Sequence, residues 1–107
     1  MINDFEIELR AENPLTNCWR DYNLLLGRDL LGDWCISVRW GRIGTAGSTA
    51  MHGFGNRDEA VAFANVLLKR RLTAPRRIGC PYRLIASSGV EQFGLGGVIR
   101  EFSEPTA

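Results

Sequence analysis

Apolar and charged residues alternate strictly at residues 5–10, which read Phe-Glu-Ile-Glu-Leu-Arg. A period of two is typical of a strand that packs one face on a core and exposes the other face to water. Less regular alternation predicts further strands at residues 20–26, 34–40 and 49–54. These segments are separated by turn residues, so we expect neighbouring strands to pair in antiparallel fashion.

A helical period replaces the alternation after Asn56. Asn56 is a favourable N-cap, and Glu59 three residues later fits a capping box. Apolar residues then recur at helical spacing, at Ala60, Phe63, Ala64, Leu67 and Leu68. The helix should end near Leu72, before Pro75. Strands, one helix and strands again predict an α+β domain, with a mainly antiparallel β-sheet and one α-helix packed across one face.

The C-terminal part has weaker patterns. We expect a strand at residues 82–85, and residues 90–93 are its candidate hairpin partner. Residues 94–97 are glycine-rich and predict a loose segment, and residues 103–107 predict a frayed end. The interpretation is a domain at residues 1–85 followed by a C-terminal extension at residues 86–107.

The chain has 107 residues, of which 45% are hydrophobic, and this length suits one domain with one modest core. No apolar stretch approaches the roughly 20 residues that a membrane-spanning helix needs, and the N-terminus lacks the features of a targeting segment. Cys18, Cys35 and Cys80 are odd in number and form no CxxC pair. We therefore expect free thiols, a reducing compartment and a cytoplasmic protein.

The net charge of +1 does not by itself indicate a nucleic-acid partner. The cations are nevertheless concentrated in residues 69–83, a segment without acidic residues that contains Lys69, Arg70, Arg71, Arg76, Arg77 and Arg83. Such a segment forms a positive patch that binds anions, or it simply reflects the preference of a helix C-terminus for cations. Both interpretations stay open.

Residues suited to catalysis are scarce. The one histidine, His52, has no apparent partner, and no cysteine lies in a nucleophile motif. No group of Cys, His and carboxylates has the spacing of metal ligands, and the glycine segments lack the Lys-Ser or Lys-Thr of a phosphate-binding loop. We therefore expect no enzymatic activity, no cofactor and no metal.

The most informative segment is the end of the third predicted strand, where Trp40-Gly41-Arg42 is followed by Gly44 and Gly47. Indole and guanidinium groups stack on sugars and bases and hold phosphates. Trp40 shares a strand face with two aliphatic residues, so we expect at least half of its surface to be buried. The glycines either form a tight turn at positive φ or expose amides that bind an anion.

These residues resemble the signature of the WGR domain family, and the resemblance runs over roughly residues 5–82. It includes Asn17 to Tyr22, Asp29-Leu30-Leu31-Gly32, the segment from Arg39 to Gly47, the helix positions Ala60 and Phe63, and the basic run before Tyr82. Members are found in poly(ADP-ribose) polymerases and as small bacterial proteins. Ser48 departs from the family's frequent Gln. Gly79 and Tyr82 are separated by two residues, whereas the family usually has Gly and Tyr next to each other.

In the polymerases the domain helps to sense DNA breaks, its Trp packing on the sugar of a 5′-terminal nucleotide and its Arg touching neighbouring domains. For this chain the resemblance implies DNA-end binding by Trp40 and no ADP-ribosyl transferase activity. It also gives an alternative, a protein-interaction adaptor that docks a partner through Arg42 and the same surface. The sequence leaves DNA and RNA as alternatives for a nucleic-acid ligand.

The predicted binding residues follow from both sources. Trp40 would stack, and the backbone of Gly44 and Gly47 would approach an anion. The predicted phosphate contacts are Arg39, Arg42, Lys69, Arg76, Arg77 and Arg83.

Overall fold

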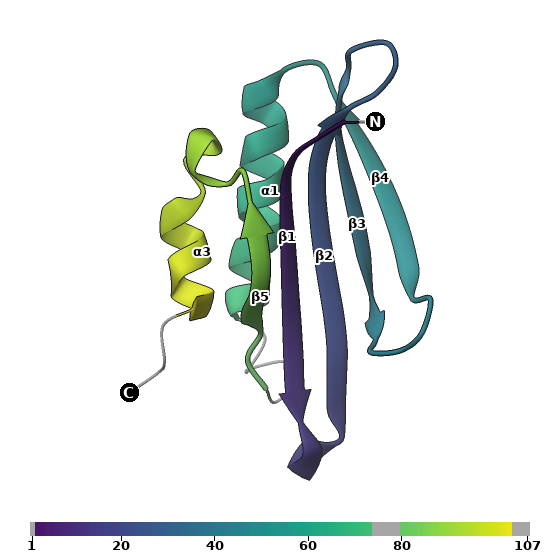
Figure 1. Cartoon of the computed structure of the whole chain (residues 1–107), viewed down its shortest axis with the longest axis vertical. Helices are drawn as coiled ribbons and strands as arrows, with labels where there is room; N and C mark the ends of the chain where they lie inside the picture. Colours follow the sequence, from purple (N-terminus) through teal and green to yellow (C-terminus); the bar gives the residue numbers. More distant parts are fainter. Residues whose placement is uncertain (1, 74–79, 104–107) are drawn as a thin grey trace.

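The computed structural model describes residues 2–73 and 80–103. Its elements are β1 (Ile2–Asn13), the 3-10 turn η1 (Pro14–Thr16), β2 (Cys18–Arg28), β3 (Trp34–Arg42), β4 (Ser48–Phe54), α1 (Arg57–Leu72), β5 (Arg83–Ser88), the 3-10 turn η2 (Glu91–Phe93) and α3 (Gly96–Ser103). Five strands form one sheet in the order β4-β3-β2-β1-β5, and each neighbouring pair is antiparallel (Figure 1). The predicted α+β class and antiparallel sheet are confirmed.

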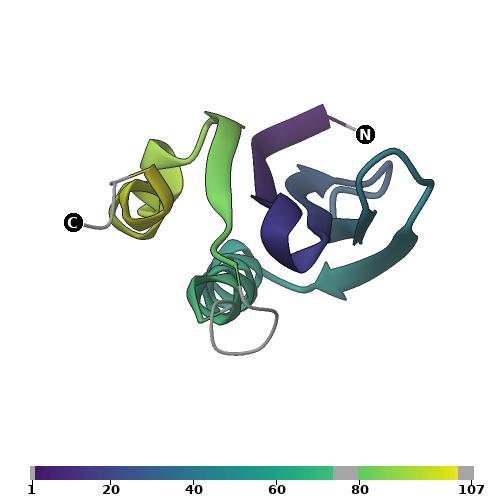
Figure 2. The same ribbon diagram turned by 90° about the horizontal axis from the view of Figure 1, so that it is seen from below.

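Helix α1 connects the two edges of the sheet and packs across one of its faces (Figure 2). We call this the helix face and the opposite one the open face. The core lies between α1 and the first three strands, and its members include Ile7, Leu9, Leu24, Leu26, Ile36, Ala60, Ala64 and Leu68. Small Ala side chains on α1 allow the helix to approach the aliphatic residues of the sheet closely. The strand alternation and the apolar helix stripe therefore position the core as predicted.

The ends of α1 are also as expected. The side-chain oxygen of Asn56 accepts a hydrogen bond of 2.9 Å from the backbone N–H of Glu59. This bond satisfies one of the amides that the first turn leaves without a partner. The helix ends at Leu72, and Thr73 follows as its C-cap.

The predicted hairpin at residues 90–93 is wrong. Residues 91–93 form η2, and Gly94 adopts a φ of 73° where η2 ends. The buried residues here are Val90, Leu95, Ile99 and Phe102, whose spacing suits a helix better than a strand. The glycines at 96 and 97, expected to be loose, begin α3.

Helix α3 contacts both α1 and β5. The predicted boundary at residue 85 falls inside β5, and the division of the chain there stays a prediction. Of the end predicted to fray, residues 104–107 lie outside the described residues.

The prediction of three free thiols is wrong for two of them, because Cys18 and Cys80 form a disulfide. The partners are 62 residues apart in sequence, and the fold brings the start of β2 beside the segment that enters β5. Cys35 is free and buried. The bond removes the argument from free thiols for a cytoplasmic location. Within the described residues, no helix has the length and apolar character needed to cross a membrane.

Candidate nucleic-acid interface

Trp40 lies near the end of β3, between Tyr22 of β2 and Ser48 of β4. Its side chain is on the helix face, because Tyr22 on the same cross-strand row belongs to the core. Trp40 is 40% exposed, so the expectation that at least half of its surface is buried is confirmed. The indole is thus held on one side by the protein and presents the rest of its surface to solvent.

The glycines around Trp40 form a tight turn. Gly44 and Gly47 have φ values of 86° and 66°, in the region that favours glycine. A Cβ atom on Gly47 would collide with the carbonyl oxygen of Trp40, and one on Gly41 would lie 2.8 Å from the Cα atom of Gly47. The tight-turn interpretation is therefore confirmed.

The turn is held by Thr45. Its backbone N–H and its hydroxyl both donate to the carbonyl oxygen of Arg42, at 3.1 and 2.7 Å. The Thr45 amide is thus used inside the turn and is not free for an anion. Anion binding by the amides of Gly44 and Gly47 stays a prediction.

Arg39 and Trp40 do not share a surface, although the two arginines next to the indole were expected to flank it. Successive residues of a strand point to opposite faces, so Arg39 lies on the open face. There its guanidinium is 3.7 Å from a carboxylate oxygen of Asp21 and donates to the carbonyl oxygen of Thr45 at 3.0 Å. The hydrogen bond to Thr45 attaches Arg39 to the turn on the open face. Of Arg39 and Arg42, only Arg42 lies on the same face as Trp40.

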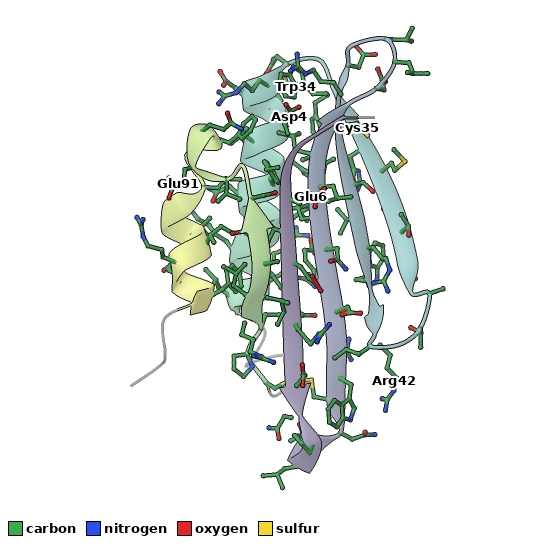
Figure 3. All side chains as sticks on the ribbon, in the orientation of Figure 1. Asp4, Glu6, Trp34, Cys35, Arg42 and Glu91 are labelled. Carbon is green, nitrogen blue, oxygen red and sulfur yellow. A yellow bond between two sulfur atoms is a disulfide. The ribbon has the colours of Figure 1, made fainter. Side chains whose placement is uncertain are left out.

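Arg42 and Arg20 are register partners at the ends of β3 and β2. Both are exposed, and strand alternation places both on the helix face with Trp40. A hollow of about 230 Å³ lies beside them, lined by Asn17, Trp19, Arg20, Gly41 and Arg42. Figure 3 shows Arg42 at the end of β3 that is remote from Trp34. Sequence analysis missed Arg20, because only the register of β2 against β3 brings it to the signature.

Arg71, in the last turn of α1, extends the basic surface toward the helix. Its guanidinium carbon lies 4.7 Å from the centre of the Tyr22 ring. A groove of about 210 Å³ separates the end of α1 from the sheet and is lined by Tyr22, Val38, Trp40, Ala50, His52, Leu67 and Arg71. Burial raises the pKa of Tyr22 above its ordinary value, and the positive charge of Arg71 offsets part of that effect.

The remaining predicted contacts are dispersed. Lys69 is exposed on α1. Arg83 opposes Arg10 across β5 and β1, and its guanidinium is 3.3 Å from a carboxylate oxygen of Glu12. Arg76 and Arg77 lie outside the described residues.

Most arginines on the strands of the sheet lie close to a carboxylate. On the open face Arg10, Arg39 and Arg83 are within salt-bridge distance of carboxylates of Glu8, Glu12 and Asp21. Among residues 2–73 and 80–103, no carboxylate makes such a pair with Arg20, Arg42 or Arg71. Arg28 is 3.6 Å from a carboxylate oxygen of Asp4. Of the arginines on the described strands, Arg20 and Arg42 are therefore the two without a carboxylate partner, and both lie on the helix face.

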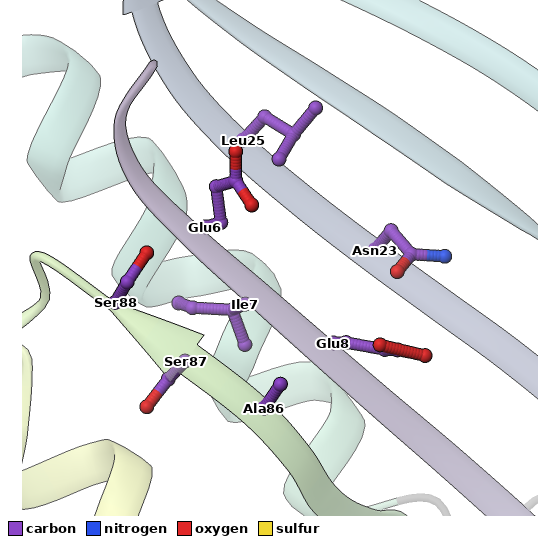
Figure 4. A pocket seen from close by; sticks show the side chains of 8 residues that line it. All are labelled: Glu6, Ile7, Glu8, Asn23, Leu25, Ala86, Ser87 and Ser88. Carbon is purple, nitrogen blue, oxygen red and sulfur yellow. The ribbon is translucent and has the colours of Figure 1, made fainter.

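A shallow pocket of about 180 Å³ on the open face has the opposite character (Figure 4). It is lined by Glu6, Ile7, Glu8, Asn23, Leu25, Ala86, Ser87 and Ser88. The two carboxylates make it a poor site for phosphate. No group of His, Cys, Asp and Glu suited to a metal ion occurs in the part of the chain that the structure describes.

Comparisons with known proteins identify a family and a relative. A family model described as "WGR domain" matches residues 8–74. "Uncharacterized protein y4dW" of Sinorhizobium fredii (strain NBRC 101917 / NGR234) is 37% identical over 67 residues, which are 63% of this chain and 33% of that protein. The match thus spans about a third of the relative's length. The family match contains Arg20, Trp40, Arg42 and Arg71 and ends before β5.

Proposed function

Because this chain belongs to the WGR domain family, we propose that it is a non-enzymatic module that binds nucleic acid, and DNA ends in particular. The binding surface is the end of the helix face where β2, β3 and α1 meet. We call this the signature surface, and it consists of Arg20, Trp40, Arg42 and Arg71.

The observation that supports the proposal most directly is the pair of arginines on the same face as Trp40. A half-exposed indole lies on the same face as two neighbouring cations, Arg20 and Arg42, for which the described residues supply no carboxylate. Like charges directly opposite one another in a sheet are unfavourable, so the pair makes sense when an anion lies between or beside them. Backbone phosphates are anions of this kind, and guanidinium groups bind them with two parallel hydrogen bonds.

Stacking and phosphate contacts both contribute to the binding free energy. Stacking of one base or sugar on an aromatic ring contributes on the order of 1–3 kcal/mol, which is too little for stable binding by Trp40 alone. Phosphate contacts by Arg20, Arg42 and Arg71 supply the rest. Each such contact on duplex DNA steepens the slope of log affinity against log salt by roughly 0.9. Binding should therefore weaken markedly as salt is raised.

The preference for an end follows from the exposed part of the Trp40 indole. Bases inside a duplex are stacked on each other, whereas the terminal nucleotide offers an open surface to an indole. The same preference is implied by the resemblance to the polymerase domains, where the signature Trp packs on a 5′-terminal sugar.

Fluorescence anisotropy with two labelled duplexes of equal length tests the proposal, one with free ends and one with both ends closed by hairpin loops. We expect tighter, salt-sensitive binding to the duplex with free ends, and loss of that preference in Trp40→Ala. Equal affinity for both duplexes, or a preference that survives Trp40→Ala, would overturn end recognition. Single-stranded DNA and an RNA duplex in the same assay distinguish the nucleic acids.

The apolar groove favours a second function, a protein-interaction adaptor. Val38, Ala50 and Leu67 give the groove beside Trp40 an apolar wall, which a phosphate backbone does not use. Trp and Arg are also the residues most often found at the centre of protein interfaces. If the folded chain does not bind nucleic acid in the anisotropy assay, the adaptor function becomes the favoured one, with Arg42 as the contact to the partner.

A further inference from the structure

The hairpin between β2 and β3 ends in two leucines that have no role in the core. Leu30 is 98% exposed and Leu31 is 87% exposed. Two adjacent leucines in water serve no purpose in folding, since burial is what makes an apolar side chain stabilising. We call residues 29–33 the leucine tip.

The leucine tip has a defined conformation. One carboxylate oxygen of Asp29 accepts hydrogen bonds from the backbone N–H groups of Leu31, at 2.9 Å, and of Asp33, at 3.0 Å. The backbone N–H of Gly32 donates a hydrogen bond to the carbonyl oxygen of Asp29, and the N–H of Asp29 donates to the carbonyl oxygen of Asp33. Gly32 has a φ of 87°. A turn fixed in this way presents its side chains with little further loss of conformational entropy on binding.

We propose that the leucine tip of one copy of this chain docks into the groove of a second copy. The groove is the hollow of about 210 Å³ beside Trp40, and its lining includes the apolar residues Val38, Ala50 and Leu67 and the cation Arg71. An apolar cavity of roughly 150 Å³ is sufficient to bind benzene, so this groove has room for a leucine side chain.

The charges of the two surfaces are complementary. Within the described residues, Arg71 has no carboxylate partner at the groove, and Asp33 has no cationic partner at the leucine tip. Docking of Leu31 into the groove brings an aspartate to the arginine. Acidic residues at the base of the tip also disfavour an anionic lipid surface as its target.

The contact must form between copies. The tip projects from the end of the sheet where β3 begins, whereas Trp40 lies six residues further along that strand (Figure 1). At about 3.3 Å per residue, this places Trp40 roughly 20 Å from the start of β3. Tip and groove are different surfaces, so one contact leaves a tip and a groove unused, which either contact each other in a two-fold pair or each bind another copy.

The association is expected to be weak. A tip of this size buries less than the roughly 1,200 Å² that a stable interface needs, so assembly should appear only as protein concentration rises. Because Trp40 borders the groove, nucleic acid bound at the signature surface should compete with it.

Complementation of two variants tests the proposal by sedimentation equilibrium. The tip variant carries Leu30→Ser and Leu31→Ser, and the groove variant carries Ala50→Phe, which fills the hollow from an edge strand. We expect the wild-type chain to assemble with concentration and each variant alone to stay monomeric. An equimolar mixture should form a 1:1 pair and nothing larger, because one intact tip meets one intact groove.

Leu15→Ser is the matched control, since Leu15 is 96% exposed on η1, outside the tip. It should assemble as the wild type does, and circular dichroism confirms that all variants are folded. A wild-type chain that stays monomeric at its highest concentration would overturn the proposal. So would assembly that persists in the tip variant, or a mixture of variants that does not pair; a different protein would then be the occupant to seek.

Discussion

Arg20 on β2 and Arg42 on β3 are paired directly across the sheet, on the face that also carries Trp40. The described part of the chain supplies neither guanidinium with a carboxylate within salt-bridge distance. On the open face, by contrast, the cations of neighbouring rows are neutralised by Glu8, Glu12 and Asp21. Of the arginines on the described strands, the two without a carboxylate partner therefore lie on the face of the sheet that carries the indole.

Arg20→Gln should change stability and binding in opposite directions. Removal of one of two opposed cations relieves a repulsion of roughly 0.2–1 kcal/mol, so the free energy of unfolding should be unchanged or slightly higher. Affinity for a DNA end should fall, because a phosphate contact is lost. Urea unfolding and anisotropy on the same preparation check both. Loss of stability together with affinity would indicate a structural role for Arg20.

Gly47→Ala should be strongly destabilising. Its φ of 66° and the contact of a new Cβ with the Trp40 carbonyl oxygen together cost about 1–3 kcal/mol or more. Gly53→Ala is the control, because an added Cβ there meets no atom within 4 Å. Thermal unfolding should show a lower midpoint for the first variant alone. Equal midpoints would mean that the turn relaxes without cost.

Reduction of the Cys18–Cys80 disulfide should lower stability considerably. The bond closes a loop of 62 residues, for which loss of unfolded-state entropy corresponds to about 4 kcal/mol. Urea unfolding with and without dithiothreitol measures the difference. Cys18→Ser/Cys80→Ser should match the reduced wild type and should not respond to the reductant. A reductant effect on the double variant would point to another thiol.

Tyr22 should make stability fall in alkaline solution. Burial holds its folded-state pKa above the ordinary 10.0, so the unfolded chain releases the phenolic proton first. The contribution of Tyr22 is complete below pH 10 and is lost as the pH rises from about 10 through the folded-state pKa. Urea unfolding at a series of alkaline pH values should show the decline, and Tyr22→Phe should reduce it.

Tyr22→Phe has a second expected effect. Among the described residues, the buried hydroxyl of Tyr22 has no hydrogen-bond partner, so its removal should cost little at neutral pH and can raise stability. A large loss of stability at neutral pH would show that the hydroxyl is satisfied in solution, for example by a bound water.

The sequence predicted the parts of the fold that depend on local patterns. Alternation around Ile7 and the capped helix after Asn56 need only nearby residues, and both were placed correctly. The apolar residues Val90 and Phe93 are compatible with a strand as well as with a helical turn. A segment this short could not show that the apolar positions continue at helical spacing to Leu95 and Ile99. The Cys18–Cys80 bond depends on a long-range approach that no local pattern records.

The candidate site was only partly predictable for the same reason. Trp40 and Arg42 are contiguous with the glycine turn and were found from the sequence. The strand alternation that placed Trp40 on the core side also puts Arg39 on the other face, a consequence that the sequence analysis did not draw. Arg20 belongs to the site only through the pairing of β2 with β3. Proximity in sequence therefore grouped Arg39 with Trp40, although the two lie on opposite faces, and did not reveal Arg20, which the register brings to the face of Trp40.

The most direct measurement compares Arg42→Gln with Arg83→Gln in DNA-end binding across a salt series. The two variants lose the same charge, but Arg42 lies beside Trp40, whereas Arg83 lies on the open face against Glu12. If DNA binds at the signature surface, Arg42→Gln should weaken affinity and reduce the slope of log affinity against log salt by roughly 0.9, the value for one phosphate contact. Arg83→Gln should bind with an affinity and a slope close to those of the wild type. Equal losses in the two variants would contradict binding at the signature surface, since the chain would then be responding to net charge alone.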